Sequence, residues 1–212
     1  MKKILLIKNL ILVGIMFLAS SGISQTFTDS NLPIVVITTD SNGGSPAPIL
    51  DTPSILGNIK IIKHPDGSRN YLTDINNAAF LNCDSRLSIQ IRGSSSQAIP
   101  KKGYGFTTLQ ANNTSNNNIS LLGMPAENDW ILNGLAFDSS LIRDNLSYYL
   151  SRQMGNYAPR TQYCELVIND EYVGLYLLQE KIKADTNRVN ILKIAATDNT
   201  LPNLSGDRKS VV

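Results

Sequence analysis

The chain has 212 residues, of which 42% are hydrophobic and 17% charged, and its mean hydropathy is -0.08. This length fits one domain, and the composition excludes a disordered chain, which would be more charged and less apolar. The formal charge of +2 includes Lys2, Lys3 and Lys8 of an N-terminal segment that we expect to be removed, so the remainder carries a charge of −1. A basic nucleic-acid-binding surface is therefore excluded.

The first 25 residues have the pattern of a secretory signal peptide. Basic Lys2 and Lys3 precede an apolar stretch over residues 10–18, and small or polar residues follow at 19–24. A membrane anchor is the alternative, but the stretch is shorter than the roughly 20 residues that span a bilayer, and no second stretch is long enough. We expect cleavage between Ser21 and Thr26, a mature chain without a membrane span, and a secreted or cell-surface location.

Four segments after the leader have the β-branched or alternating pattern of strands: residues 32–39, 57–63, 86–92 and 103–108. In the third of them Leu87, Ile89 and Ile91 share one face, which places Arg92 on the face away from the core. A polar, Asn-rich segment over residues 112–118 predicts a loop.

The clearest helix is predicted over residues 139–154. Asp138 or Ser139 can cap its start, apolar residues recur at helical spacing, and Gly155 suits the position after its end. A hairpin follows, with strands over 163–168 and 172–178, and an extended pattern resumes over 188–194. These elements predict an α+β fold with a mainly antiparallel sheet and one main helix.

The few cysteine and histidine residues exclude whole classes of site. Cys83, Cys164 and His64 are too few for a four-ligand Cys/His zinc site within the chain. A Ser-His-Asp triad would need His64, which lies in a sequence typical of a tight turn, residues 64–67. In an oxidising compartment the two cysteines either pair or remain buried thiols, and the sequence leaves both possibilities open.

A first constellation that could carry chemistry lies between two predicted strands. Arg92, Gly93 and the three hydroxyls of residues 94–96 leave one strand, and Lys101 and Lys102 open the next. A turn with exposed backbone donors and nearby lysines can receive a polyphosphate. An ordinary surface hairpin explains the same residues, and the spacing is not that of a Walker A loop.

A second constellation follows the last predicted strand, at residues 174–182. A strand that emerges into a short polar segment can present backbone N–H and C=O groups to a flat heterocycle, as at many nucleotide-base sites. The residues in question are Gln179, Glu180, Lys181 and Ile182. The alternative is a hairpin strand with a charged exit.

The order of these pieces resembles the CotH (spore coat protein H) kinase family from about Leu32 to Ser205. The segments that carry the resemblance are residues 91–96, 100–104, 130–132, 141–145, 157–161, 167–176 and 180–182. The resemblance implies a protein-kinase-like fold that binds ATP, with magnesium or another divalent metal in the full-length protein. It also implies phosphorylation of Ser or Thr in secreted or cell-surface proteins.

On this resemblance the chain corresponds to the small lobe of a kinase. Lys102, or else Lys101, is then the phosphate-contacting lysine, because a nearby positive charge stabilises the transferring phosphoryl group. Adjacent strand residues face opposite ways, so only one of the two can point into the site. The implied ATP-contacting set is Arg92, Ser94, Ser95, Ser96, Lys101, Lys102, Gln179, Glu180, Lys181 and Ile182.

The end of the chain departs from the family. Relatives continue into a large lobe that supplies the catalytic and metal-binding acids, so we expect residues 26–206 to be an inactive N-terminal portion of a kinase domain. Residues 207–212 match the translation of a sequencing adapter, which predicts a truncated gene model. Leu177, Ile182 and Ile191 are then expected to form an exposed apolar patch.

Two other functions compete with the kinase interpretation. The first is a non-catalytic secreted binding or surface-structural domain on the same scaffold. The second is a carbohydrate-binding domain, which would need exposed aromatic platforms. The single tryptophan, Trp130, lies in a segment that we expect to be packed.

Overall fold

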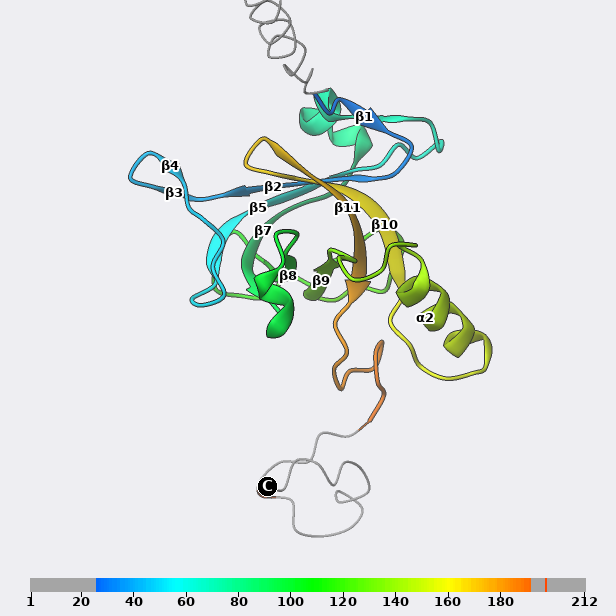
Figure 1. Cartoon of the computed structure of the whole chain (residues 1–212). Coiled ribbons are helices and arrows are strands. Elements are labelled where there is room, and N and C mark those ends of the chain that lie inside the picture. The colour runs from blue at the N-terminus through cyan, green and yellow to red at the C-terminus, as the bar shows by residue number, and fades with distance from the viewer. Residues whose placement is uncertain (1–25, 192–196, 198–212) are drawn as a thin grey trace, which may run out of the picture.

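The computed structural model describes residues 26–191 and residue 197 (Figure 1). The predicted signal peptide, the tail at 207–212 and the second half of the extended run predicted over 188–194 lie outside these residues. In the part described, residues 188–191 do not form a strand. Arg188 and Val189 instead belong to a turn that is closed by an isolated bridge between Ala184 and Val189.

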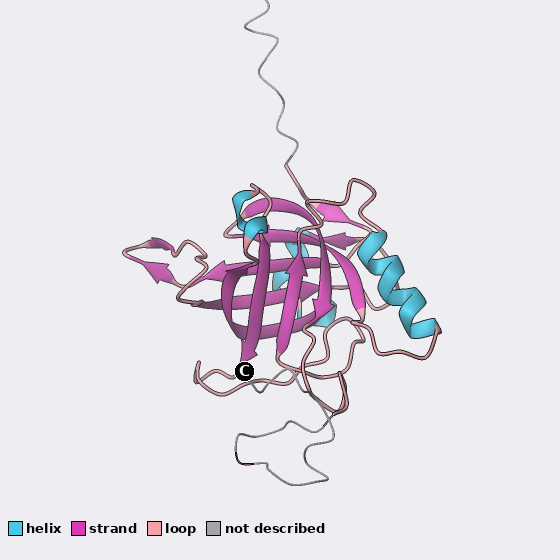
Figure 2. Ribbon diagram, turned by 60° about the horizontal axis from the view of Figure 1, so that its bottom comes forward, coloured by secondary structure: helices cyan, strands magenta, loops and turns pink. Residues whose placement is uncertain are grey.

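Seven strands close into a barrel (Figure 2) in the order β10-β11-β9-β8-β7-β5-β2, and every neighbouring pair is antiparallel except β10 with β2. The strands are β2 (Ile34–Thr39), β5 (Ile55–Ile62), β7 (Leu81–Arg92), β8 (Gly103–Leu109), β9 (Asp129–Asn133), β10 (Thr161–Ile168) and β11 (Glu171–Glu180).

Short elements decorate the barrel. β1 (Asp29–Ser30) pairs with β6 (Asn70–Tyr71), and β3 (Ser41–Asn42) pairs with β4 (Ser45–Pro46) in a hairpin that projects from the barrel in Figure 1. Three 3₁₀ helices are η1 (Leu72–Asn76), η2 (Ala78–Phe80) and η3 (Ser95–Ala98), and the α-helix is α2 (Arg143–Gln153). No helix among the residues described is long and apolar enough to cross a membrane.

The predicted fold class is confirmed at the level of an α+β fold with mostly antiparallel strands and one main helix. The closure of the sheet was not predicted. It depends on parallel pairing of β10 with β2, where Glu165 lies opposite Ile34 and Ile168 opposite Ile37. Local patterns carry no information about a pairing between segments so far apart in the chain.

The barrel interior is the main core. Leu87 and Ile89 on β7, Trp130 on β9 and Tyr176 on β11 are fully buried within one apolar cluster. Burial of a large apolar side chain of this kind stabilises the folded state by roughly 1.5–3 kcal/mol. The alternation predicted for β7 and the packed position predicted for Trp130 are therefore confirmed.

A smaller cluster lies on the outside of β2 and β10. Ile34, Val36, Ile62 and Val167 are buried there, and Phe27, Leu72, Ile75, Phe80 and Leu81 pack against them. η1 and η2 thus cover the outer side of this part of the barrel.

Helix α2 begins four residues later than predicted. Leu141 has a φ of 60°, outside the helical range, so residues 138–142 form a turn instead. Asp138 fulfils its predicted capping role, because its Oδ2 accepts a hydrogen bond of 2.8 Å from the backbone N–H of Arg143. Gly155 has a φ of 82°, the left-handed conformation predicted for the position after the helix.

The predicted apolar patch is only partly present. Ile182 and Ile191 are 60% and 49% exposed, as expected, but Leu177 is fully buried. The start of α2 lies over both neighbours of β11, because Tyr163 on β10 donates a hydrogen bond to Leu141 O and Asn133 on β9 donates one to Asp144. This segment therefore covers Leu177, so its predicted exposure was wrong.

The two cysteines are free thiols in the barrel core. Cys83 lies on β7 and Cys164 on β10. Burial raises the pKa of each thiol to about 12, so neither is a reactive thiolate at neutral pH.

Candidate functional site

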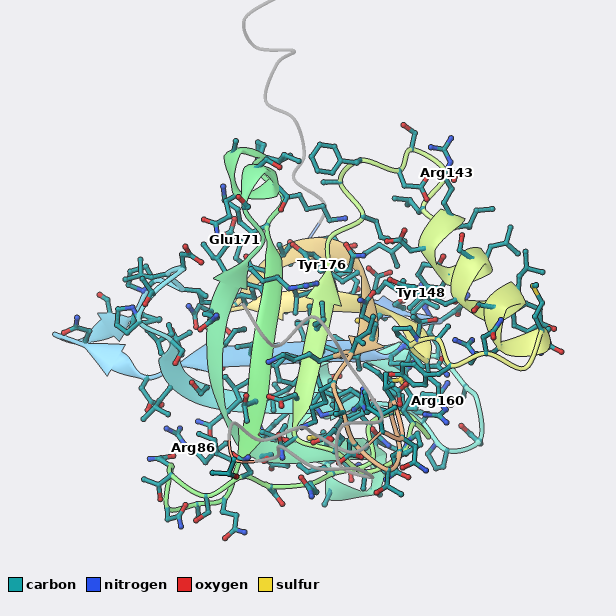
Figure 3. All side chains as sticks on the ribbon, turned by 90° about the horizontal axis from the view of Figure 1, so that it is seen from below. Arg86, Arg143, Tyr148, Arg160, Glu171 and Tyr176 are labelled. Carbon is teal, nitrogen blue, oxygen red and sulfur yellow. The ribbon has the colours of Figure 1, made fainter. Side chains whose placement is uncertain are left out.

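Two hollows lie on the outer face of β7, β8 and β9, the face that Figure 3 presents with β2 and β10 crossing behind it. The strand hollow, of about 210 Å³, is lined by Ser54, Ser88, Gln90, Arg92, Gly105, Phe106, Thr107, Asp129, Trp130, Ile131 and Lys181. The loop hollow, of about 200 Å³, is lined by Arg92, Gly93, Ser96, Ile99, Lys101, Gly103, Asn133, Gly134, Leu135, Ala136 and Phe137. Arg92 is common to both.

Two glycines leave the outer face of β8 bare between these hollows. Tyr104 and Phe106 point into the barrel core, so Gly103 and Gly105 take the outward positions between and beside them. A Cβ atom on Gly105 would have only one neighbouring atom within 4 Å, the Cβ of Arg92 at 3.9 Å. The face of β8 is thus open to a flat group.

The stem of Arg92 lies across this bare face. Its Cγ would be 3.6 Å from a Cβ on Gly103, and its Cβ 3.9 Å from one on Gly105. The exposed guanidinium makes no hydrogen bond or ion pair with any residue in the described ranges. An Arg fork with free donors between two hollows is suited to an anion with several oxygens.

The turn after β7 depends on Gly93. This residue has a φ of 111°, and a Cβ on it would lie 2.0 Å from Ser96 Oγ, so only glycine fits. Gln97 closes the turn by donating a hydrogen bond of 2.7 Å to Gly93 O. Of the three predicted hydroxyls only Ser96 lines a hollow, whereas Ser94 and Ser95 line neither.

The two predicted lysines precede β8 and reach in different directions. Lys101 lines the loop hollow, and its Nζ donates a hydrogen bond of 2.6 Å to Leu175 O and lies 5.0 Å from the centroid of the Tyr176 ring. Burial lowers the pKa of Lys101, against the opposing influence of the Glu165 charge. Lys102 instead donates to Gln97 O in the turn.

Only one residue of the predicted hinge lines a hollow. Lys181 bounds the strand hollow, with its Nζ 4.0 Å from Asp129 Oδ1. Glu180 is fully buried and accepts hydrogen bonds from Nη1 and the backbone N–H of Arg160, at 2.8 and 2.9 Å. Gln179 is also buried, while Ile182 is exposed outside both hollows.

An ion-pair network that was not predicted closes the far end of the strand hollow. Asp129 accepts hydrogen bonds from Thr107 at 2.8 Å and from Lys183 at 2.9 Å, and Lys183 also reaches Glu127 at 2.8 Å. Burial alone would raise the pKa of Asp129, but the hydrogen bonds from Lys183 and Thr107 lower it overall. The carboxylate is therefore ionised and committed to these partners.

His64 has a contact chain that the sequence did not reveal. Its Nδ1 lies 2.9 Å from Ser68 Oγ and its Nε2 2.8 Å from Asp74 Oδ2. The predicted turn holds, and the turn N–H groups of Gly67 and Ser68 already donate to His64 O and Asp66 Oδ1. Through Ser68 and Asp74, His64 thus connects its own turn to η1.

Metal binding gains no support from the described part of the chain. It contains no group of three or more His, Cys, Asp or Glu residues placed to hold a metal ion. The site consists instead of cations around an open strand face: Arg92, Lys101 and Lys181, with Asp129 already paired.

A comparison with protein families gives a match to the CotH kinase protein model over residues 89–207. The chain belongs to the CotH kinase family. The matched range is more than half of the chain. It begins within β7 and includes the whole lining of the loop hollow and that of the strand hollow except Ser54 and Ser88. Family membership indicates a kinase-like function and confirms the resemblance found in the sequence. No curated protein matches the chain.

Proposed function

We propose that this CotH-family chain binds ATP on the outer face of β7, β8 and β9, as the nucleotide-binding lobe of a secreted protein kinase. The observation that carries the proposal is the free guanidinium of Arg92, which lies between two hollows on a strand face kept bare by Gly103 and Gly105. Family membership supplies the reaction class.

The loop hollow is the proposed phosphate site. Arg92, Lys101 and Ser96 line it and offer two positive charges and a hydroxyl donor. Lys102, the lysine favoured by the sequence, lies beside it through its bond to Gln97 O and would join when that turn moves. Charge-assisted hydrogen bonds to phosphate oxygens are among the strongest that a protein forms.

The strand hollow is the proposed base site. Gly105 forms its floor, Gln90 and Ile131 form two walls, and Thr107 and Lys181 supply polar groups at its end. The lining of this hollow is mostly polar, so a flat heterocycle would be held by hydrogen bonds to these groups and by contact with the bare strand face at Gly105. The remaining predicted hinge residues would act here through the backbone, because the Glu180 carboxylate is held by Arg160.

The order of elements supports a small-lobe interpretation. A glycine turn, a strand, a helix and a last hairpin follow one another, as in protein kinases, where a glycine loop covers the phosphates. Two details differ from that pattern. The lysines precede β8 instead of lying on the next strand, and the acid on α2, Asp144, accepts a hydrogen bond from Asn133. β2 and β5 close the sheet into a barrel.

In the full-length protein we propose transfer of the ATP γ-phosphoryl group to Ser or Thr of a secreted or surface protein. The described residues do not offer a carboxylate cluster for magnesium, so none of them is assigned a role in metal binding. Secretion is tested by N-terminal sequencing of exported protein, which should begin between residues 21 and 26. Soluble cytoplasmic protein that retains Met1 would contradict it.

Binding of ATP is tested by calorimetry on the full chain with ATP and with inorganic tripolyphosphate. Arg92→Met should weaken ATP binding about tenfold, or ~1.4 kcal/mol. The control is Arg69→Met, because Arg69 pairs with Asp29 and Asn31 away from both hollows. Equal loss in both variants, or no binding by the wild type, would refute the proposal. Equal affinity for tripolyphosphate and ATP would refute the base site.

A further inference from the structure

One buried cation is not explained by the site described above. The Arg188 side chain has no exposed surface, and none of its three guanidinium nitrogens has a hydrogen-bond partner among the described residues. Its Cζ lies 4.8 Å from the centroid of the Trp130 ring, and its Nε lies 3.7 Å from Glu180 Oε1, beyond hydrogen-bond range. The buried hydroxyl of Tyr157 also meets no hydrogen-bond partner at normal geometry in this part of the chain, but it lies near Arg188, whose charge opposes the rise in the pKa of Tyr157 that burial causes.

This arrangement is costly for stability. A buried polar group without a hydrogen bond destabilises the folded state, and a buried charged group without one does so more strongly. Contact with the Trp130 ring and the ion pair with Glu180 at 3.7 Å offset part of this cost. Glu180 does not depend on Arg188, because both of its oxygens already accept hydrogen bonds from Arg160. A purely stabilising role therefore does not account for an arginine at this position.

The location of Arg188 connects it to the strand hollow. Glu180 and Trp130 are register partners on β11 and β9, and Arg188 contacts both from the barrel side. The residues that follow and precede this pair, Lys181 and Asp129, line the hollow on the outer side. Arg188 therefore lies on one side of the Glu180–Trp130 pair, and the proposed base site lies on the other.

Arg188 lies within the segment that leaves β11. Residues 183–189, the exit turn, are closed by hydrogen bonds from Asp185 N to Val189 O at 3.0 Å and from Val189 N to Lys183 O at 3.2 Å. Arg160 Nη1 donates to Asn187 O at 3.1 Å, so the turn is held beside Glu180 (Arg160 is labelled in Figure 3). Lys183, at its start, carries the ion pairs to Glu127 and Asp129.

We propose that Arg188 is a positioning residue, which holds the exit turn against Trp130 and thereby fixes Lys181 and Asp129 at the end of the strand hollow. The consequence for ligand binding rests on the proposed nucleotide function, whereas the anchoring of the exit turn does not. Displacement of a binding group by about 1 Å is enough to weaken a site substantially.

The test compares the full chain with its Arg188→Met and Arg188→Lys variants. Arg69→Met is the control, because Arg69 pairs with Asp29 and Asn31. Because Trp130 is the only tryptophan, acrylamide quenching of its fluorescence reports directly on the covering of its ring. Hydrogen exchange of residues 181–189, thermal unfolding and ATP affinity complete the set of measurements.

We expect Arg188→Met to unfold at the wild-type temperature or above, because an apolar side chain removes the unpaired donors. Quenching of Trp130 should at least double, exchange in the exit turn should accelerate at least tenfold, and ATP affinity should fall about tenfold. Arg188→Lys should show the same local changes, because an ammonium lacks the planar group that stacks on the ring.

Two results would overturn the proposal. The first is that Trp130 quenching and hydrogen exchange are unchanged in both variants. The second is a lower unfolding temperature with faster exchange throughout the strands, which would indicate a general stabilising role. If the wild type binds no ATP, the nucleotide function fails by itself. Quenching and exchange then still decide whether Arg188 anchors the exit turn.

Discussion

The inner and outer sides of the same strands differ sharply. Inside the barrel, Leu87, Tyr104, Phe106 and Trp130 fill the space between the strands. Outside, over β7, β8 and β9, glycines replace large side chains and a free arginine lies over two hollows. The inner side is built for stability. The outer side is less densely packed and leaves the Arg92 guanidinium without a partner among the described residues, which suits the ligand binding that we propose for it.

The largest effect should follow from damage to the inner side. Trp130→Ala removes a fully buried ring and should lower the free energy of unfolding by about 3–5 kcal/mol. Arg92→Met, on the outer side of the neighbouring strands, should change it by less than about 0.5 kcal/mol. Urea unfolding of both variants measures the difference. Similar losses would remove the distinction between the two sides.

The second prediction concerns phosphoryl transfer in a completed, active protein. Loss of the phosphate-contacting lysine typically costs a few kcal/mol, or about a hundredfold in rate. The sequence favours Lys102, whereas the hollow is lined by Lys101. Comparison of Lys102→Ala and Lys101→Ala in a phosphorylation assay decides between them.

Lys63→Ala is the control for this comparison, because Lys63 lies beside His64 and away from the outer face of β8. If neither Lys101→Ala nor Lys102→Ala changes the rate, the assignment of the phosphate site to the loop hollow is wrong.

The third prediction concerns the bare face of β8. Gly105→Val would fill the strand hollow while the β-branched side chain suits a strand, so stability should hold. ATP affinity should fall about tenfold or more in a binding titration. Unimpaired binding by a folded Gly105→Val protein would mean that no base lies on this face.

Some of this organisation could be predicted from the sequence, and some could not. The alternation over residues 86–92 identifies the face of Arg92, and the turn residues identify the loop for which we propose anion binding, because both depend on neighbours in the chain. The two glycines of β8, two positions apart, are a further local signal, since they share one face of the strand and leave it open.

Other features depend on distant residues. The closure of the barrel requires β10 to pair with β2, and the burial of Leu177 requires the start of α2 to cross β9 and β10. Likewise the inward position of Glu180 depends on Arg160, and the position of Arg188 depends on Trp130. No local pattern specifies these contacts, so the sequence does not reveal which of the predicted hinge side chains are held by other partners.

The smallest expected effect is a pH dependence at the edge of the outer face. The pKa of Asp129 is lowered in the folded state, so its contribution to stability is present above the unfolded-state pKa, near 3.8, and is lost as the pH falls through the folded-state pKa. Asp129→Asn should therefore cost about 1 kcal/mol or less at pH 7 and nothing at about pH 2. Thermal unfolding at both pH values measures this. A constant difference would mean that charge is not the cause.

The most direct test of the central claim is photolabelling of the full chain with 8-azido-ATP, followed by identification of the labelled peptide. The account predicts labelling within residues 88–92, 103–107 or 129–133, and its suppression by excess ATP. Specific labelling that is confined to another part of the chain, such as the hollow beside His64, would contradict the assignment of the nucleotide to the outer face of β7, β8 and β9.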